Sequence, residues 1–462
     1  MRDRPSRILV TYEARIPSVE LGAIIPLSYL QTMGYCELTY KDEMLLSLAD
    51  IAWCDVLFVV RGATTQILWI ADSAKKLQRK VVGYWDDDLL NIPSYSLAYA
   101  YYSMPETKEN ISRLFTITDL FFSPSPKLAD KLSTIYKSKV KVLPVAYGPE
   151  NLKPPSGRNH DFPVVGYAGG LDHIRLLDTF LGPVIKGVLD NDANFNIHIV
   201  GPRPDFIDKL KDRTVFNSYI EDYYEYLNFI SCLNWDIGLA PQVDCEFTTY
   251  KFYNKFLEYT SIGCAGIYSK LEPYIGVVQN GVTGLLVDNE IEAWKDAILV
   301  LLKDSGLRLR IARNAYEFVR DLHNRKVVAE KYVTALGPFL NYKAPEIRFA
   351  DRIECLIGNK EARDPIDTNE ATVNGKETHV RGLEEAIKDE KTYISHLERI
   401  VKDDEATLNQ SYGSRGWKLL VRYYRMRNKI LLIDSYIRKA IILIFRGMTS
   451  FLNHFKGIIL DS

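Results

Sequence analysis

Short apolar runs alternate with helical patterns from residue 7 to about residue 150 of the chain. The runs are rich in β-branched residues, which is typical of buried strands, and lie at 7–10, 36–40, 55–60, 81–84, 120–122 and 140–143. Between them, apolar residues recur with helical spacing, as in 64–79 and 126–136. Strands that alternate with helices predict parallel βαβ units in a doubly wound sheet.

A second series of the same kind follows a break at 153–157, Lys-Pro-Pro-Ser-Gly, whose composition is typical of a linker. Its strands are expected at 163–167, 195–200, 237–240, 266–268 and 284–287, and its last helices at 292–302 and 307–322. The fold class is therefore α/β, with two Rossmann-like domains, 1–153 and 154–341, facing a cleft.

The remaining residues form a different region. Segment 342–378 is polar and is interpreted as a linker. From Val380, apolar residues recur every seven positions, which predicts a coiled-coil helix over 379–410. Glu390 and Asp404 fall on the companion position and weaken the seam, so a homodimer through this helix is left open. A helical extension is thus expected after the two domains.

Residues 411–462 contain ten Lys or Arg against two Asp, interleaved with aromatic and aliphatic residues. A basic amphipathic helix of this kind favours an anionic membrane surface. The alternative is a terminal helix packed on the body, with its charges in solvent. Since the chain has no apolar run of about 20 residues and no signal peptide, we expect a cytoplasmic protein, peripheral on the inner face of the plasma membrane.

Composition and charge bear on which classes of function are possible. The formal net charge is −1, and 47% of the 462 residues are hydrophobic, as in ordinary globular proteins. Such a balance gives no support for a nucleic-acid partner. The six cysteines are scattered without C-x-x-C pairs, so they are interpreted as reduced thiols.

Three charged residues have a spacing that suggests chemistry. Lys251, Lys255 and Glu258 stand at i, i+4 and i+7, which predicts one face of a helix. A carboxylate can accept two hydroxyls of a ribose or sugar, and lysines can neutralise a diphosphate. The alternative is a ladder of surface ion pairs.

Glycines follow two strands of the second series. Gly169 and Gly170, with His173 and Arg175 close behind, come after the strand at 163–167, and Gly201 follows 195–200. Glycines allow the backbone to approach a phosphate, and Arg175 could supply a guanidinium for a diphosphate. A tight turn without a ligand is the alternative.

Charged residues follow two strands of the first series. Asp86, Asp87 and Asp88 end the strand at 81–84, and Glu13 and Arg15 follow the first strand. Adjacent carboxylates could bind a metal ion or supply a general base, whereas Asp also caps helices. We predict that they position an acceptor or are structural, with a general base as the alternative, and assign no metal.

The run from Asp236 to Pro241, followed by Lys251, Lys255, Glu258-Tyr259 and the segment 280–287, resembles the donor-binding half of group 1 glycosyltransferases with the GT-B fold. The resemblance extends over about 5–340. It implies a nucleotide diphosphate sugar bound by the second domain, an acceptor bound by the first, no cofactor, and retention of anomeric configuration. By this resemblance Glu258 looks like the second glutamate of an E-x7-E motif, which binds ribose. Tyr250 stands where the first would be.

The resemblance implies roles for the candidate residues. Catalytic roles fall to Glu258, Lys251, Arg175 and Asp87. Substrate-binding roles fall to Gly169, Gly170, His173, Lys255, Tyr250, Tyr259, Gly201, Asp86, Asp88, Glu13 and Arg15. The tail resembles those of enzymes that assemble bacterial surface polysaccharides, which implies a glycan or lipid-linked acceptor. The alternatives are a nucleotide-sugar epimerase or hydrolase, and a degenerate GT-B scaffold, which Tyr250 favours.

Overall fold

The computed structural model describes residues 4–346, apart from Ser138, 148–151, Lys153, 157–161 and Asp192. The expected coiled coil at 379–410, the basic tail at 411–462 and all but the first residues of the linker at 342–378 lie outside the described residues. These three assignments therefore stay predictions.

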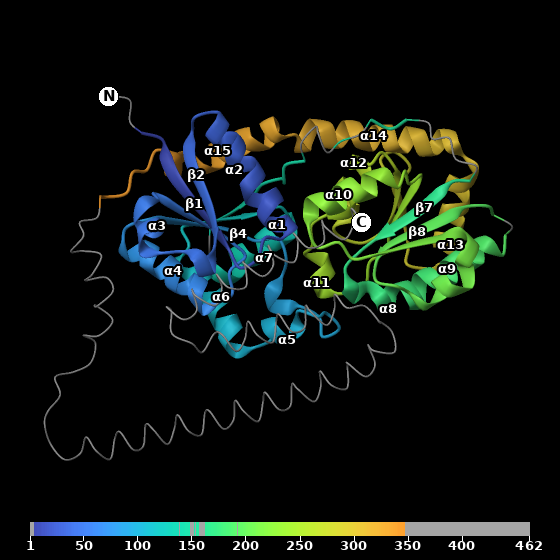
Figure 1. Ribbon diagram of the computed structural model, residues 1–462, viewed down its shortest axis with the longest axis horizontal. Coiled ribbons are helices and arrows are strands. Elements are labelled where there is room, and N and C mark those ends of the chain that lie inside the picture. Colours follow the sequence, from blue (N-terminus) through green and yellow to red (C-terminus); the bar gives the residue numbers. More distant parts are fainter. Residues whose placement is uncertain are drawn as a thin grey trace, which may run out of the picture. The chain divides into compact units, whose positions relative to one another are not determined.

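The first domain is built on six parallel strands in the order β2-β1-β3-β4-β5-β6 (Figure 1). The strands are β1 Ser6–Tyr12, β2 Cys36–Asp42, β3 Val56–Val60, β4 Lys80–Tyr84, β5 Leu120–Ser123 and β6 Val140–Val142. Along β1, Ile8 and Val10 join one apolar cluster, whereas Leu9 joins the cluster on the other face. Both faces of this sheet are therefore covered, as its continuous apolar runs predict.

Helices flank this sheet, and several begin at a residue that caps them. They are α1 Pro17–Val19, α2 Ile25–Thr32, α3 Leu48–Trp53, α4 Thr65–Lys76, α5 Tyr99–Tyr102, α6 Pro105–Ile117 and α7 Pro126–Tyr136. Thr64 accepts a hydrogen bond from the Ile67 amide at the start of α4, and Ser125 accepts one from the Leu128 amide at the start of α7. These side chains satisfy amide groups that have no partner inside the helix.

The second domain repeats the pattern with strands in the order β12-β11-β10-β7-β8-β9. They are β7 Val164–Ala168, β8 Asn196–Gly201, β9 Thr214–Ser218, β10 Ile237–Ala240, β11 Ala265–Ser269 and β12 Leu285–Val287. The predicted α/β class with two parallel sheets is confirmed. Sequence reasoning missed β9, an edge strand with no buried residue in its burial pattern and hence no continuous apolar run.

The helices of this second part are α8 Ile174–Leu176, α9 Gly182–Leu189, α10 Tyr223–Cys232, α11 Glu246–Thr249, α12 Asn254–Ser261, α13 Ile291–Lys303, α14 Ser305–His323 and α15 Arg325–Leu340. The last of them, α15, returns to the first domain and lies beside α2 (Figure 1). Tyr332 of α15 donates a hydrogen bond to the Gly22 carbonyl at 2.6 Å, and its ring contacts Phe122 of β5. Residues 325–340, expected within the second domain, thus pack on the first.

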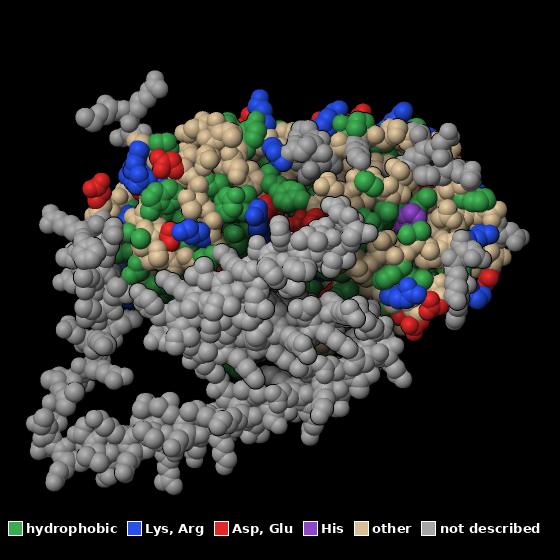
Figure 2. All heavy atoms as spheres, viewed as in Figure 1, with side chains coloured by type: hydrophobic (Ala, Val, Ile, Leu, Met, Phe, Trp, Pro, Cys, Tyr) green, Lys and Arg blue, Asp and Glu red, His purple; other side chains and the backbone are tan. Residues whose placement is uncertain are grey.

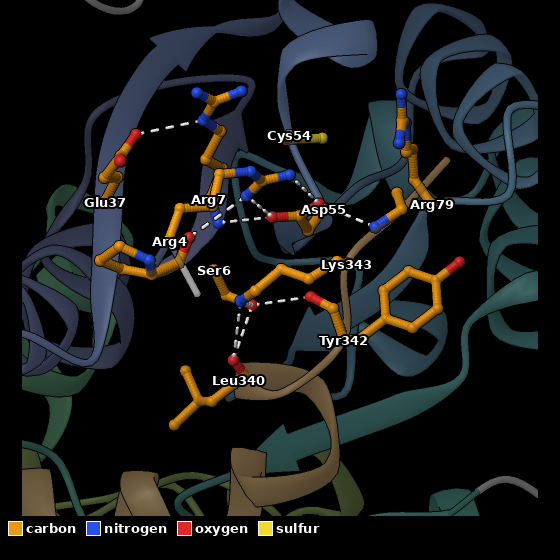
Figure 3. Close-up of polar contacts among 12 residues, drawn as sticks. Arg4, Ser6, Arg7, Glu37, Cys54, Asp55, Arg79, Leu340, Tyr342 and Lys343 are labelled. Atoms are coloured by element: carbon orange, nitrogen blue, oxygen red, sulfur yellow. Dashed lines mark hydrogen bonds and ion pairs between the residues drawn. The ribbon is translucent and has the colours of Figure 1, made fainter. Parts of the chain in front are cut away.

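After α15 the chain is attached to the amino edge of the first sheet (Figure 3). The Asp55 carboxylate accepts hydrogen bonds from the amides of Arg7 and Ala344, at 2.9 and 2.8 Å, and pairs with the Arg4 guanidinium. Arg79 donates to the Pro345 carbonyl at 3.1 Å. Residues 342–346, predicted as the start of a linker, are therefore held in place at the edge opposite the one where β4 leads into Asp86.

Both connections between the sheets meet at His323, the last residue of α14. The His323 carbonyl accepts a hydrogen bond from the Tyr147 amide at 2.6 Å, and its Nδ1 donates to the Val145 carbonyl at 2.9 Å. Its Nε2 lies 3.3 Å from the Tyr253 hydroxyl, which can donate to it. Burial lowers the pKa of His323 to about 4, although the hydrogen bond that it donates to Val145 opposes this shift, so the imidazole is neutral at pH 7.

The Asp55 contacts predict a specific loss of stability. Burial opposes ionisation of Asp55, but Arg4 and the two amides outweigh it and lower its pKa, so its contribution is present above pH of about 4 and lost on further acidification. We expect Asp55→Asn to reduce the free energy of unfolding by about 2 kcal/mol, measured with denaturant at pH 7. Glu37→Gln is the control, since it breaks a half-exposed pair with Arg7. Equal effects of the two changes would contradict this account.

His323 predicts a second, pH-dependent effect. Its folded-state pKa is depressed, so its contribution to stability is present above pH 6.5, its ordinary value, and is lost as the pH falls toward 4. Between pH 7 and pH 5 the wild type should lose about 2 kcal/mol more than His323→Asn, in which no imidazole titrates. Denaturant unfolding at both pH values measures the difference. Parallel losses in the two proteins would show that His323 is not the group responsible.

Candidate functional site

Glycines keep the backbone open at the carboxyl ends of β7 and β8. A Cβ on Gly169 would overlap the Tyr167 hydroxyl, and one on Gly201, where φ is 125°, would overlap the Gly169 carbonyl oxygen. Gly170 directly precedes the short helix that contains His173. The two strand ends thus lie in close contact with each other and with Tyr167, and this packing leaves no room for a side chain at either glycine.

His173 lies beside these glycines, and its pKa depends on burial and on the charges around it. Burial raises the pKa of Tyr167 well above its usual range, so its hydroxyl stays protonated and donates to His173 Nδ1 at 2.6 Å. Burial lowers the pKa of His173 to about 4, and Lys251 and Lys255 add to this while Asp172 opposes it. The charges of two lysines therefore act on an imidazole that is neutral at pH 7 and lies next to Gly169.

Glu258 lies on α12, and its side chain is 11% exposed. Its Oε2 accepts hydrogen bonds from the Tyr226 hydroxyl at 2.7 Å and from Lys255 Nζ at 2.5 Å. Burial and the Glu258 charge raise the pKa of Tyr226 well above its usual range, which keeps this phenol a donor. Within the part of the chain that the structure describes, Oε1 accepts no hydrogen bond, so one carboxylate oxygen is left for the hydroxyl of a ligand.

The prediction that Lys251 shares a helical face with Lys255 and Glu258 is wrong. Lys251 lies in the loop between α11 and α12, because α12 begins only at Asn254. Phe252 and Tyr253, the two residues between, both pack on His323, with ring centroids at 6.5 and 5.8 Å. Consecutive helical residues diverge by about 100°, so a continuous helix could not place both rings there.

Lys251 instead reaches the first domain. Its Nζ lies 3.4 Å from Asp87 Oδ1 and over the Phe247 ring, 4.5 Å from the centroid. Arg61 of the loop after β3 binds both Asp86 and Asp87, at 2.6 and 2.8 Å. Burial opposes ionisation of Asp87, but Lys251 and Arg61 outweigh it and lower its pKa. Asp87 is therefore an anion at neutral pH that joins the two domains.

Asp88 belongs to a second set of contacts. It pairs with Lys131 of α7 at 2.7 Å, and Lys131 also binds Glu246 of the second domain at 2.8 Å. The Lys131 ammonium lies 4.2 Å from the centroid of the Tyr250 ring, which packs against the apolar cluster of the first domain. In the described residues no group of three His, Cys, Asp or Glu side chains could hold a metal ion. Each of the three aspartates contacts a protein cation, but Arg61 and Lys131 are each shared by two carboxylates.

Four candidates lie elsewhere. Tyr259 is fully buried and donates to the Leu239 carbonyl at 2.6 Å, so it packs helix against strand and offers no surface to the predicted substrate. Arg175 is exposed on α8. Arg15 pairs with Glu20, and the Glu13 charge acts on Tyr102. Of the remaining candidates, Lys255 contacts Glu258 and His173 lies beside Gly169, whereas Lys251 contacts Asp87 of the first domain.

Sequence reasoning missed Arg61, Lys131 and Tyr226. Arg61 has a left-handed backbone, with φ of 50°, and follows an apolar strand that shows no sign of such a turn. Lys131 lies in an ordinary amphipathic helix, α7, and Tyr226 lies 32 residues before its partner Glu258. A Tyr-Tyr-Glu-Tyr run at 223–226 is the signal that could have drawn attention to α10.

Comparisons with known proteins agree with this geometry. Residues 162–304 match the family of group 1 glycosyl transferases. A glycosyltransferase from Rickettsia africae is 15% identical with a TM-score of 0.52, over 73% of this chain and 99% of that one. HepE from Anabaena in complex with UDP-glucose is 12% identical with a TM-score of 0.51, over 72% and 100%. Sucrose-phosphate synthase from Thermosynechococcus elongatus is 13% identical with a TM-score of 0.50, over 72% and 98%.

No curated protein sequence matches the chain. The structural matches confirm the predicted GT-B fold, and the family match, which lies within the second domain, supports a glycosyltransferase. Over residues 4–346, with the gaps noted, no helix has the length and apolar character needed to cross a membrane.

The close contact between Gly169 and Gly201 predicts that one added methyl group reduces the free energy of unfolding. Gly201→Ala should reduce the free energy of unfolding by about 2 kcal/mol or more, because the new Cβ meets the Gly169 backbone and φ is unfavourable. Gly337→Ala on α15 is the control, since its Cβ would enter open space in a helix and should be neutral or stabilising. Thermal or denaturant unfolding compares them. A neutral Gly201→Ala would mean that the two strand ends are not held this close.

Proposed function

We propose that this protein is a glycosyltransferase that moves a sugar from a nucleotide diphosphate sugar to a hydroxyl of a glycan acceptor. The observation that carries the proposal is the Glu258 carboxylate, whose Oε1 accepts no hydrogen bond within the described residues and which lies on the helix that also bears Lys255. This pairs a hydroxyl acceptor with a cation, as a nucleoside diphosphate requires. The family match over 162–304 supports the same assignment.

Different residues would bind different parts of the donor. Glu258 Oε1 would accept a ribose hydroxyl while Tyr226 and Lys255 hold Oε2. The backbone at Gly169 and Gly201 would approach the diphosphate, and Lys255 and Lys251 would balance its charge. Such pre-positioned charges favour departure of the diphosphate, because they act where negative charge develops.

The reaction exchanges one bond at the anomeric carbon. The bond to the diphosphate oxygen breaks, a bond to the acceptor hydroxyl oxygen forms, and the acceptor proton passes to the departing diphosphate. Attack from the same face as departure would retain the anomeric configuration. In this scheme Lys251 has two uses, since it pairs with Asp87 at 3.4 Å without donor and would face the diphosphate with donor.

The proposal extends to the acceptor and the cellular setting. The first domain would bind the acceptor near Asp86–Asp88, and the tail at 411–462 would bring the enzyme to an anionic membrane carrying a lipid-linked glycan. The role would be in synthesis of a cell-surface polysaccharide. Uridine is the first base to test, because HepE, which shares the fold, was crystallised with UDP-glucose.

A binding or scaffold protein is the second candidate. Tyr250, at the place of a motif glutamate, packs on the first domain under Lys131 and supplies no carboxylate to a donor. A nucleotide-sugar hydrolase or epimerase would instead consume the donor without acceptor. Nucleotide binding separates the scaffold from the enzymes, and donor turnover without acceptor identifies the hydrolase or epimerase.

Glu258→Ala tests the site directly. We expect transfer, or UDP release from UDP-sugars, to fall about 30-fold or more, because the ribose loses a charged hydrogen-bond partner. Circular dichroism and thermal unfolding establish that the variant is folded, and Glu258→Gln keeps the shape with a neutral acceptor. Glu292→Ala, on an exposed side chain of α13, is the control and should behave as wild type. A folded Glu258→Ala protein with wild-type turnover would refute the site.

A further inference from the structure

Helix α10 carries three tyrosines whose hydroxyls bond to three different parts of the protein. Tyr223 donates to Tyr147, in the connection between the sheets, at 3.0 Å. Tyr224 donates to Glu20, in the first domain, at 2.9 Å. Tyr226 donates to Glu258, in the donor site, at 2.7 Å. Asp222 caps the helix and accepts hydrogen bonds from the amides of Tyr224 and Glu225, so this turn is well fixed.

The contact with the first domain involves a buried carboxylate. Glu20 is 3% exposed, and it accepts hydrogen bonds from Arg15 as well as from Tyr224. Acidic and basic side chains gather around the position of α1 on the face drawn in Figure 2. A buried carboxylate that loses a partner is costly, so Tyr224 and Glu20 should stay together while the domains hold this arrangement.

The contact with the donor site fixes the direction of Glu258. Tyr226 and Lys255 both bind Oε2, and the Lys255 ammonium lies 5.5 Å from the centroid of the Tyr226 ring. Both donors thus bind the same oxygen of the carboxylate. A shift of α10 would therefore move the Tyr226 hydroxyl and change the direction of the carboxylate.

We propose that Tyr224 is a positioning residue: through the first turns of α10 it couples the Glu20 contact with the first domain to the orientation of Glu258, and hence to nucleotide affinity. The inference rests on the proposed function, because it assigns the nucleotide to Glu258. Tyr224 itself is 38% exposed and bonds to Glu20, so it acts on the nucleotide only through the helix. Linkage is reciprocal, and bound nucleotide therefore strengthens the Tyr224–Glu20 contact.

The experiment measures the dissociation constant of UDP by calorimetry for the full-length chain and its variants. Tyr226→Phe should weaken UDP about tenfold, and Tyr224→Phe about threefold to tenfold, each without loss of thermal stability beyond a few degrees. Tyr316→Phe on α14, whose hydroxyl has no hydrogen bond within the described residues, is the matched control and should bind UDP as wild type does. Tyr224→Phe with wild-type affinity overturns the inference.

Two further readouts separate positioning from simple packing. Glu20→Gln keeps an oxygen that accepts from Tyr224 and should retain more UDP affinity than Glu20→Ala does. Hydrogen exchange at 17–24 and at the start of α10 should slow when UDP binds the wild type, and this slowing should disappear in Tyr224→Phe. Exchange that responds to UDP equally in both proteins would contradict the coupling.

The outcomes distinguish this inference from the function beneath it. A folded Glu258→Ala protein that binds UDP as tightly as wild type, or a wild type that binds neither UDP nor GDP, contradicts the proposed function. Loss of UDP binding in Glu258→Ala, together with unchanged binding in Tyr224→Phe, contradicts only the coupling through α10.

Discussion

The fold depends on how one chain crosses twice between two parallel sheets, and both crossings are fixed at His323. A neutral imidazole is suited to this position because one ring nitrogen donates to the Val145 carbonyl while the other can accept from Tyr253. Its own carbonyl accepts from the Tyr147 amide in the other crossing. Since Tyr253 lies two residues after Lys251, the same contacts that join the domains also place the loop of the candidate site.

Charged side chains from both domains form the domain contact, with four carboxylates against three cations. The first domain supplies three aspartates with Arg61 and Lys131, and the second supplies Lys251 and Glu246. Asp87 shares its carboxylate between Arg61 and Lys251, the longer contact being that with Lys251, at 3.4 Å. A diphosphate beside Lys251 would compete for this lysine, while Arg61 would stay bound to both Asp86 and Asp87.

Sequence alone predicted what depends on local pattern. The apolar runs of β1, β3 and β10 are buried on both faces, and such strands can be predicted from the sequence. The prediction that Lys251, Lys255 and Glu258 share a helical face was wrong. Their spacing in the sequence does not show that Phe252 and Tyr253 both pack on His323. Arg61, Lys131 and Tyr226 gain their roles from partners that only the tertiary fold brings near.

The tyrosine at position 250 has a physical reason in these contacts. Lys131 already has two carboxylate partners, Asp88 and Glu246, so the three groups together carry a net negative charge. A glutamate at 250 would place a third carboxylate against the same ammonium and repel the other two. An aromatic face attracts the cation without adding charge, and it packs on the apolar cluster of the first domain. Tyr250 therefore contributes a contact between the domains and no carboxylate.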